Sequence, residues 1–306
     1  MVESSQDIDV SQGTAEPVNF NQYDRSSLSY ASTFEDPWKS TVIRIMEALT
    51  GKLTILRLVR KFEQAGAPQG QAFWRAALDV MGIDLLTPQD QLARIPKTGP
   101  VIVVSNHPHG MVDGMIFADL IGRVRPDYRI LTRSLLTVID EVAGSYMIPV
   151  PFPHDPNAQR KGVEMRAKAM QYLKDGGVVA LFPSGGVAAS ETFFGPAIEA
   201  EWNVFTAKLI RRSGATVVPI KFPGQNSRAY QIANKLSPML RQGLLLHEIV
   251  YSLNKSQAPI VGEPLDQDEL RKWDDDPRGF MAWLRAHTLS LTPDGATAEM
   301  PKPDAE

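Results

Sequence analysis

Residues 101–114 read VIVVSNHPHGMVDG. The segment opens with an unbroken apolar run of four residues, and Gly99-Pro100 precedes it. Such a short run is typical of a strand that is buried on both faces of a parallel sheet. Polar residues that suit chemistry follow the strand at once. Because ligands of open α/β sheets bind beyond the carboxyl ends of the strands, this turn is the first candidate for a site.

Working outward, the rest of the chain alternates between short apolar runs and helical patterns. We expect helical stretches at 113–123, 158–174 and 199–212. They separate most of the further strand candidates, which are 128–131, 146–150, 177–182, 216–221 and 258–262. This alternation predicts an α/β fold with a largely parallel central sheet flanked by helices.

An amphipathic helical extension precedes this domain. Apolar residues recur at steps of three and four over 38–63, which predicts helix, and Gly51 is a candidate break within it. Six bases and one acid accompany the stripe up to residue 61. A further helix is expected over 70–81. Such a basic amphipathic segment can lie in the headgroup region of a membrane or pack on the α/β domain, and both interpretations stay open. The predicted stripe is Val42, Ile45, Met46, Leu49, Leu53, Leu56 and Val59.

Charge divides the chain into a basic body and acidic ends. Residues 1–36 carry a net charge of −6 and read as a mostly disordered tail, and residues 292–306 carry −3 and read as a second disordered tail. Between them we expect a helical layer over 37–90 and the catalytic domain over 91–291, with 30 bases and 24 acids in residues 37–291. A basic body suits an anionic partner, such as a phosphate-bearing substrate, an acidic carrier protein or an anionic lipid surface, although it also serves ordinary solubility. We expect no nucleic-acid partner.

Composition excludes several classes of protein. The chain has no cysteine, so a disulfide framework, a thiolate metal site and a cysteine nucleophile are excluded. The five histidines show no zincin spacing, and we expect no metal. No apolar run reaches 18 residues, and the N-terminus lacks the pattern of a signal peptide. We therefore expect a protein of the cytoplasm or of a membrane surface.

The turn after the first strand places two histidines near one aspartate. Asp113 is expected to cap the next helix and to reach back toward His107 or His109. A carboxylate on one imidazole nitrogen fixes the tautomer and leaves the other nitrogen as a base. The plainer alternative is that Asp113 is only a helix cap and the histidines are ordinary loop residues.

Two further strand candidates have unusual features, a glycine-rich turn after one and a proline inside the other. The run VVALF at 178–182 leads into Pro183-Ser184-Gly185-Gly186, whose consecutive amides could form an anion-binding nest. The run 215–220 contains Pro219, which is awkward inside a sheet and suggests an edge, an end or a bulge.

The segments NHPHGMVDG, FPSGG and VVPI, in this order, resemble the glycerolipid acyltransferases, the PlsC-like family. The likeness is closer to the hemolysin-like branch, whose GxNSxxxxxA pattern is similar to residues 224–233 here, GQNSRAYQIA. The resemblance covers roughly residues 40–265.

The resemblance implies site residues. His107 and Asp113 would be catalytic, and His107 is preferred to His109 because it directly follows the strand and Asn106. Ser184 stands where the family usually has Glu, and Val187 where it often has Arg, which puts the acceptor in doubt; Arg133, Arg160, Lys161 or Arg166 could replace the missing cation. The implied substrate-binding residues are Asn106, His109, Arg133, Ser184, Gly185, Gly186 and Pro219.

The resemblance also implies a reaction. A fatty acyl group would move from an acyl carrier protein or coenzyme A thioester, used as co-substrate, to the hydroxyl of a lysolipid such as lysophosphatidate, with no cofactor. The enzyme would be cytoplasmic and peripheral, at the anionic inner face of a membrane. Two alternatives remain: a serine-type lipid hydrolase that uses Ser184 with His107 and Asp113, although FPSGG is not the GxSxG elbow, and a non-catalytic lipid-binding protein on the same scaffold.

Overall fold

The computed structural model describes residues 29–33, 36–133, 141–151, 155–265 and 267–297. Its centre is a six-stranded sheet in the order β3-β2-β4-β1-β5-β6. The first five of these strands run parallel, and β6 is antiparallel to β5. This arrangement confirms the predicted fold class. The strands are β1 (Val101–Ser105), β2 (Tyr128–Arg133), β3 (Met147–Val150), β4 (Val178–Leu181), β5 (Thr216–Lys221) and β6 (Ile260–Val261).

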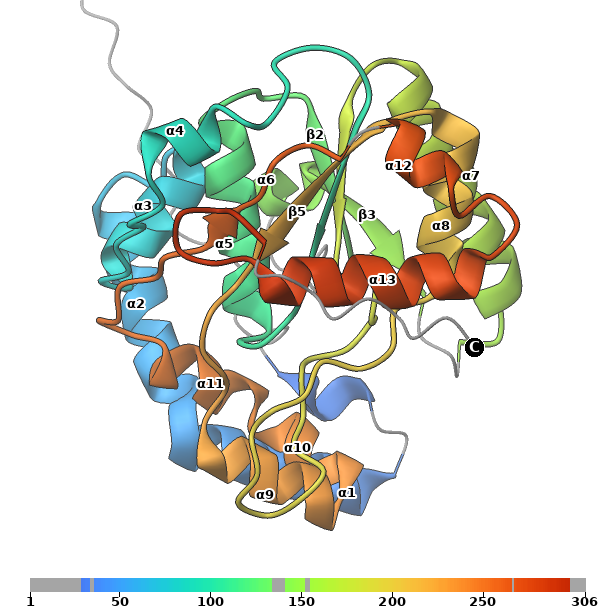
Figure 1. The fold of residues 1–306 in the computed structure, drawn as a ribbon. Coiled ribbons are helices and arrows are strands. Elements are labelled where there is room, and N and C mark those ends of the chain that lie inside the picture. The colour runs from blue at the N-terminus through green and yellow to red at the C-terminus, as the bar shows by residue number, and fades with distance from the viewer. Residues whose placement is uncertain (1–28, 34–35, 134–140, 152–154, 266, 298–306) are drawn as a thin grey trace, which may run out of the picture.

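Helices cover both faces of the sheet (Figure 1). Val101 and Val103 of β1 pack into one apolar layer with α5, whereas Ile102 and Val104 pack into the opposite layer with α7, α8 and α13. The run VIVV is unbroken because both faces of β1 are buried. The helices of the two layers are α3 (Ala72–Val80), α4 (Gln89–Leu92), α5 (Met111–Gly122), α6 (Glu141–Ser145), α7 (Ala158–Lys174), α8 (Val204–Ser213), α12 (Gln267–Arg271) and α13 (Pro277–Ser290).

The N-terminal extension is one helical path with a π-helical segment in its middle. It consists of α1 (Pro37–Glu47), η2 (Ala48–Lys52) and α2 (Leu53–Gln64). Gly51 does not separate two helices, as the sequence suggested it could; it lies in the π segment, and a Cβ there would come within 2.9 Å of the carbonyl oxygen of Leu246. The missing side chain therefore lets η2 approach α11 (Leu245–Tyr251) closely.

Helices from distant parts of the sequence form a lobe at one end of the molecule (Figure 1). The lobe contains α1, α9 (Arg228–Leu236), α10 (Pro238–Gly243) and α11. α1 packs on α10, and α10 on α9. The arrowheads of β3 and β5 point toward this lobe, so the carboxyl ends of the parallel strands face it.

The predicted apolar stripe is only partly a packing surface. The buried residues of α1 and α2 are Ile43, Glu47, Ile55, Phe62 and Glu63. Ile45, Leu49 and Leu53, three members of the stripe, are exposed instead. The interpretation of the stripe as an internal packing face is therefore wrong for these residues. No helix of the described chain combines the length and apolarity that a membrane crossing requires.

Parts of both predicted tails lie within the described residues and are folded there. Residues 30–33 form the 3₁₀ helix η1 (Tyr30–Thr33), and Glu47 holds it through the hydroxyl of Ser29 at 2.6 Å and the backbone amide of Tyr30 at 2.7 Å. At the other end, Leu291 and Thr297 pair as a β-bridge, so residues 292–297 fold back on the domain. Residues 1–28 and 298–306 of the predicted tails lie outside the described residues.

Candidate active site

The sheet order brings three strand ends together. β1 lies between β4 and β5, so the turn after β1 is flanked by the segments after both neighbours. Asn106 joins two of these ends, because its side-chain amide donates to the carbonyl of Phe222 and accepts from the amide of Phe222, each at 2.8 Å. Asn106 is buried and its side-chain amide is engaged with protein backbone. Its contact with substrate stays a prediction.

The helix after the turn begins earlier than expected, and Asp113 is not its N-cap. α5 starts at Met111, and the cap position is Gly110, whose positive φ of 73° suits glycine. Asp113 is the third residue of the helix. From there its carboxylate folds back and accepts from the backbone amide of His109 at 2.8 Å. Reaching back from the third helical position is how the acidic residue of a capping box acts.

Asp113 contacts both histidines. Its Oδ2 lies 3.0 Å from Nδ1 of His107, and its Oδ1 lies 2.9 Å from Nδ1 of His109. Burial alone would raise the pKa of Asp113, but hydrogen bonds from the two histidines outweigh it and hold that pKa below its ordinary value. An ionised Asp113 accepts hydrogen bonds only, so both rings carry a proton on Nδ1. On each ring the unprotonated lone pair then lies on Nε2.

His107 is the more open of the two histidines. Its side chain is 17% exposed, against 8% for His109. The described residues offer no hydrogen-bond partner to its Nε2. Phe182, the first residue after β4, stacks on its ring with centroids 3.9 Å apart and planes at 18°. Phe117 of α5 stacks on the other side of Phe182. The position of His107 after the strand, which the sequence indicated, thus coincides with an oriented and accessible imidazole.

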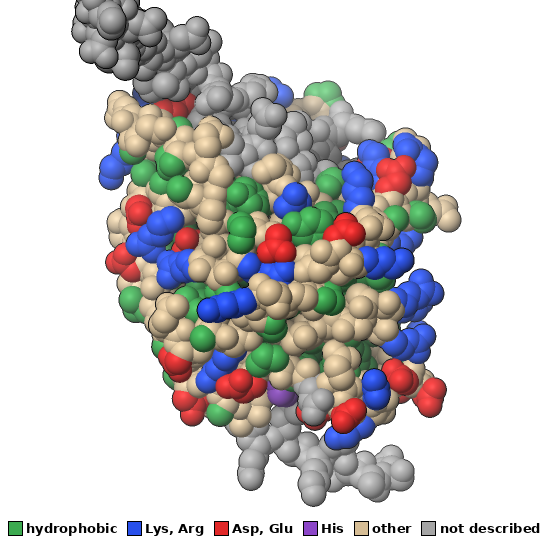
Figure 2. Space-filling model, turned by 90° about the horizontal axis from the view of Figure 1, so that it is seen from above, with side chains coloured by type: hydrophobic (Ala, Val, Ile, Leu, Met, Phe, Trp, Pro, Cys, Tyr) green, Lys and Arg blue, Asp and Glu red, His purple; other side chains and the backbone are tan. Residues whose placement is uncertain are grey.

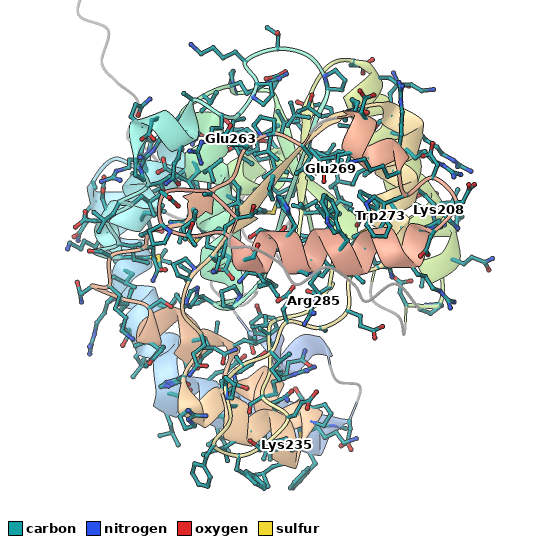
Figure 3. The ribbon with its side chains drawn as sticks, viewed as in Figure 1. Lys208, Lys235, Glu263, Glu269, Trp273 and Arg285 are labelled. Carbon is teal, nitrogen blue, oxygen red and sulfur yellow. The ribbon has the colours of Figure 1, made fainter. Side chains whose placement is uncertain are left out.

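Glu199 is a residue of the site that the sequence did not reveal. Its Oε2 accepts from the backbone amide of His107 at 3.1 Å, and its Oε1 accepts from the indole of Trp202 at 3.2 Å. Arg285 of α13, labelled in Figure 3, donates to the carbonyl of Glu199. The sequence placed Glu199 at the start of a helix over 199–212, but α8 begins at Val204, where Asn203 caps it. No motif marks Glu199, and only the fold reveals its contact.

The turn FPSGG is ordered by its own backbone. Ser184 donates its hydroxyl to the carbonyl of Gly186 at 3.0 Å, and the amide of Gly185 donates to Phe182 at 3.0 Å. Within the described part of the chain the amide of Gly186 has no protein acceptor, so it remains available to an anion. No described contact joins Ser184 to His107, and the arrangement lacks the base that a serine nucleophile needs.

Two predicted binding residues lie apart from this cluster. Pro219 is buried inside β5 opposite Val104, and its carbonyl accepts from Gly262 at 2.9 Å. It is thus neither at a strand end nor on an edge strand, and the short partner strand β6 accommodates it. Arg133 is the last residue of β2, at the carboxyl edge of the sheet; the position of its side chain lies outside what the structure describes.

The other three candidate replacement cations lie on α7. Arg160 pairs with Glu164 at 2.7 Å, and Lys161 pairs with Asp155 at 2.5 Å, while Arg166 is exposed. No described contact links any of the three to the histidines. Among the described residues there is no group of histidine, aspartate and glutamate side chains that could hold a metal ion.

A family model described as Acyltransferase matches residues 54–258, which is more than half of the chain. Among solved structures, the chain is similar to the 1-acyl-sn-glycerophosphate (LPA) acyltransferase PlsC from Thermotoga maritima. The two share 15% sequence identity, the match covers 83% of this chain and 85% of that chain, and the TM-score is 0.43. A search of the curated proteins found no match.

Proposed function

Because this chain belongs to the acyltransferase family, we propose that it transfers a fatty acyl group from a thioester donor to the hydroxyl of a lysolipid in membrane-lipid synthesis. Lysophosphatidate is the first acceptor to test. The observation that carries the proposal is the pairing of His107 with the buried carboxylate of Asp113 at 3.0 Å, with Nε2 of His107 left open at the carboxyl edge of the sheet.

The chemistry needs one base and one carboxylate. Nε2 of His107 takes the proton of the acceptor hydroxyl as the oxygen attacks the thioester carbon, and Asp113 stabilises the imidazolium that forms. The tetrahedral intermediate then collapses, the carbon–sulfur bond breaks, and His107 returns the proton to the leaving thiolate. Because a thioester is already activated, no nucleophile of the enzyme's own is needed. The complete absence of cysteine is compatible with this route.

The oxyanion of the intermediate needs hydrogen-bond donors. We assign this role to the amide of Gly186, which has no protein acceptor among the described residues. Gly185 is less suited than the sequence suggested, since its amide already donates to Phe182. The residues that directly follow the FPSGG turn lie against the histidine turn, because the amide of Ala188 donates to the carbonyl of His107 at 2.8 Å and the side chain of Val187 lies beside Gly110.

We place the thioester donor against the basic side of the molecule. Lys and Arg side chains gather along the edge of Figure 2 that corresponds to α7 and α8 in Figure 1, and Lys208 lies on this side in Figure 3. Both coenzyme A and acyl carrier protein are acidic, so this surface would attract either one. The exposed bases of α7 and α8 include Arg166, Lys168, Lys174, Lys208 and Arg212.

We place the membrane against the exposed side of the N-terminal extension (α1, η2 and α2) and the end of the lobe that contains α1. The side chains of Trp38, Leu49 and Leu53 are 66%, 82% and 61% exposed. Exposing so much apolar surface to water is unfavourable, and contact with a lipid surface would bury it. Leu236, at the end of α9, is also exposed, and Lys235 beside it lies at the end of this lobe (Figure 3). Bases accompany the apolar residues, as in helices that lie in an anionic headgroup layer. The inner face of a cell membrane, with its anionic lipids, fits this surface.

Product analysis tests the proposal against its alternatives. The purified chain is incubated with mixed lysolipids and with acyl carrier protein or coenzyme A thioesters, and products are identified by mass spectrometry. A new acylated lipid supports transfer, and loss of that product in His107→Gln links it to the site. Free fatty acid alone would indicate a hydrolase. Lipid retention without any product would indicate a binding protein.

A further inference from the structure

Asp113 holds two imidazoles, and the mechanism above uses only one of them. His109 is buried, and its ring nitrogen Nδ1 lies 2.9 Å from Oδ1 of Asp113. Its backbone amide donates to the other carboxylate oxygen at 2.8 Å. His107 shares that second oxygen at 3.0 Å. One fully buried negative charge therefore accepts three hydrogen bonds, two of them from His109.

The far side of the His109 ring is closed by protein. A Cβ built on Gly224 would lie 3.0 Å from Nε2 of His109, closer than most side chains approach, so the backbone of Gly224 lies close to the ring. The backbone of Gly224 has a φ of +93°, which also favours glycine. His109 therefore faces backbone where His107 faces an open site. This position is unsuited to contact with substrate, which was the role that the sequence suggested.

Sharing the carboxylate has an electrostatic consequence. Each donor to Asp113 stabilises its negative charge and so reduces how strongly the carboxylate stabilises a charged His107. Besides Asp113, the charged group in described contact with these histidines is Glu199, from the segment between β4 and α8. The segments from β4 and β5 that touch the rings contribute Phe182 and Gly224, which carry no charge.

We propose that His109 is a positioning residue: it orients the Asp113 carboxylate and, by sharing its charge, sets the pH at which His107 works as a base. The inference rests on the proposed function for its catalytic meaning. The carboxylate sharing itself is a property of the folded chain and can be measured without any substrate.

Two variants of similar volume distinguish the hydrogen bond that Nδ1–H of His109 donates from the packing of the His109 side chain. The substitution His109→Asn keeps a side-chain N–H near the position of Nδ1, whereas His109→Leu removes it. The pKa of His107 is measured by NMR from the ring Cε1–H signals, of which the chain has five, one for each histidine. The His107→Gln variant assigns the signal.

We expect the His107 signal to titrate at higher pH in His109→Leu than in the wild type, because Asp113 then serves one imidazole alone. In His109→Asn it should stay closer to the wild-type value. An unchanged His107 pKa in a folded His109→Leu protein would overturn the proposal and leave His109 as a space-filling residue. This result does not depend on activity, so failure of the inference is distinguished from failure of the proposed function.

Kinetics supply the second readout. If transfer is observed, the acid limb of the profile of kcat/KM against pH should move upward in His109→Leu by the same amount as the NMR pKa. A uniform loss of rate with an unmoved profile would contradict the proposal. Loss of activity at every pH in both His109 variants, with activity retained in His107→Gln, would make His109 the base and would also overturn it.

Discussion

The ring of Phe182 lies parallel to the imidazole of His107, with centroids 3.9 Å apart and planes at 18°. Phe182 ends the path of β4, whereas His107 follows β1, so the pairing of these two strands creates the contact. With Asp113 holding Nδ1 and Phe182 holding the ring face, the direction of Nε2 is determined. Two contacts from different elements thus orient one proton acceptor.

This stacking predicts a rate effect for Phe182→Leu. An aromatic pair contributes about 0.5–1.5 kcal/mol beyond its buried area, so kcat should fall by up to about tenfold if the ring mainly orients His107. Phe117→Leu is the matched control, because Phe117 stacks on the opposite face of Phe182. The Phe117→Leu variant should be less stable than the wild type but should have nearly the same kcat. Equal effects of the two variants on kcat would refute an orienting role for Phe182.

Loss of the base should be far more severe. We expect His107→Gln to lower the rate of acyl transfer by about a hundredfold to ten-thousandfold, the usual contribution of a general base. Circular dichroism should show a folded protein. His247→Gln serves as control, since His247 lies on α11 and contacts Thr50. Unchanged turnover in His107→Gln would remove the proposed mechanism.

Asp113→Asn should lower the rate of acyl transfer much more than it lowers the stability of the fold. The variant keeps most of the shape but loses the charge that supports an imidazolium, so the rate should fall by orders of magnitude. The folded-state pKa of Asp113 lies below its ordinary value of 3.8. Its ionised form therefore stabilises the fold fully above pH 3.8, and this stabilisation is lost as the pH falls through the lower folded-state pKa. Denaturant unfolding of wild type and variant from neutral to acidic pH measures the difference, which should shrink on acidification; a constant difference would contradict this linkage.

Membrane attachment should depend on the basic helices of the N-terminal extension. Substituting Gln for Lys52, Arg57, Arg60 and Lys61 should weaken binding to anionic liposomes, since each well-placed base contributes roughly 1 kcal/mol at low salt. Leu49→Ser should weaken the part of the binding that resists salt. Sedimentation measures both. If wild-type protein does not bind anionic liposomes at low salt, the proposed membrane face is wrong.

Substitution of the bases of α7 and α8 tests donor binding, as the preceding variants test membrane binding. Substituting Gln for Lys168, Lys174, Lys208 and Arg212 should raise the KM for the thioester donor, with most of the effect lost at high salt. Liposome binding of this variant should match wild type. A donor KM that does not change would show that the thioester docks elsewhere.

The sequence by itself determined the elements and the position of the candidate site in the fold. Every predicted strand is present within one or two residues at its ends, because apolar runs bounded by glycine and proline are local signals. The histidine turn lies at the carboxyl edge of the sheet, since a residue that directly follows a buried parallel strand has no other place. The exact start of α5 was wrong because Gly110, and not Asp113, makes the cap.

Only the tertiary structure decided what surrounds His107. Glu199 is 92 residues away in the sequence and Phe222 is 116 residues from Asn106, and nothing in their spacing encodes these contacts. The exposed side of α1 and η2 was likewise undecided, because helical periodicity shows that a stripe exists but not which face finds a partner. The contact of both histidines with the Asp113 carboxylate was also decided by the tertiary structure. Spacing brought both histidines within reach, but the positive φ of Gly110 and the close approach of Gly224 determined that both rings bind one carboxylate.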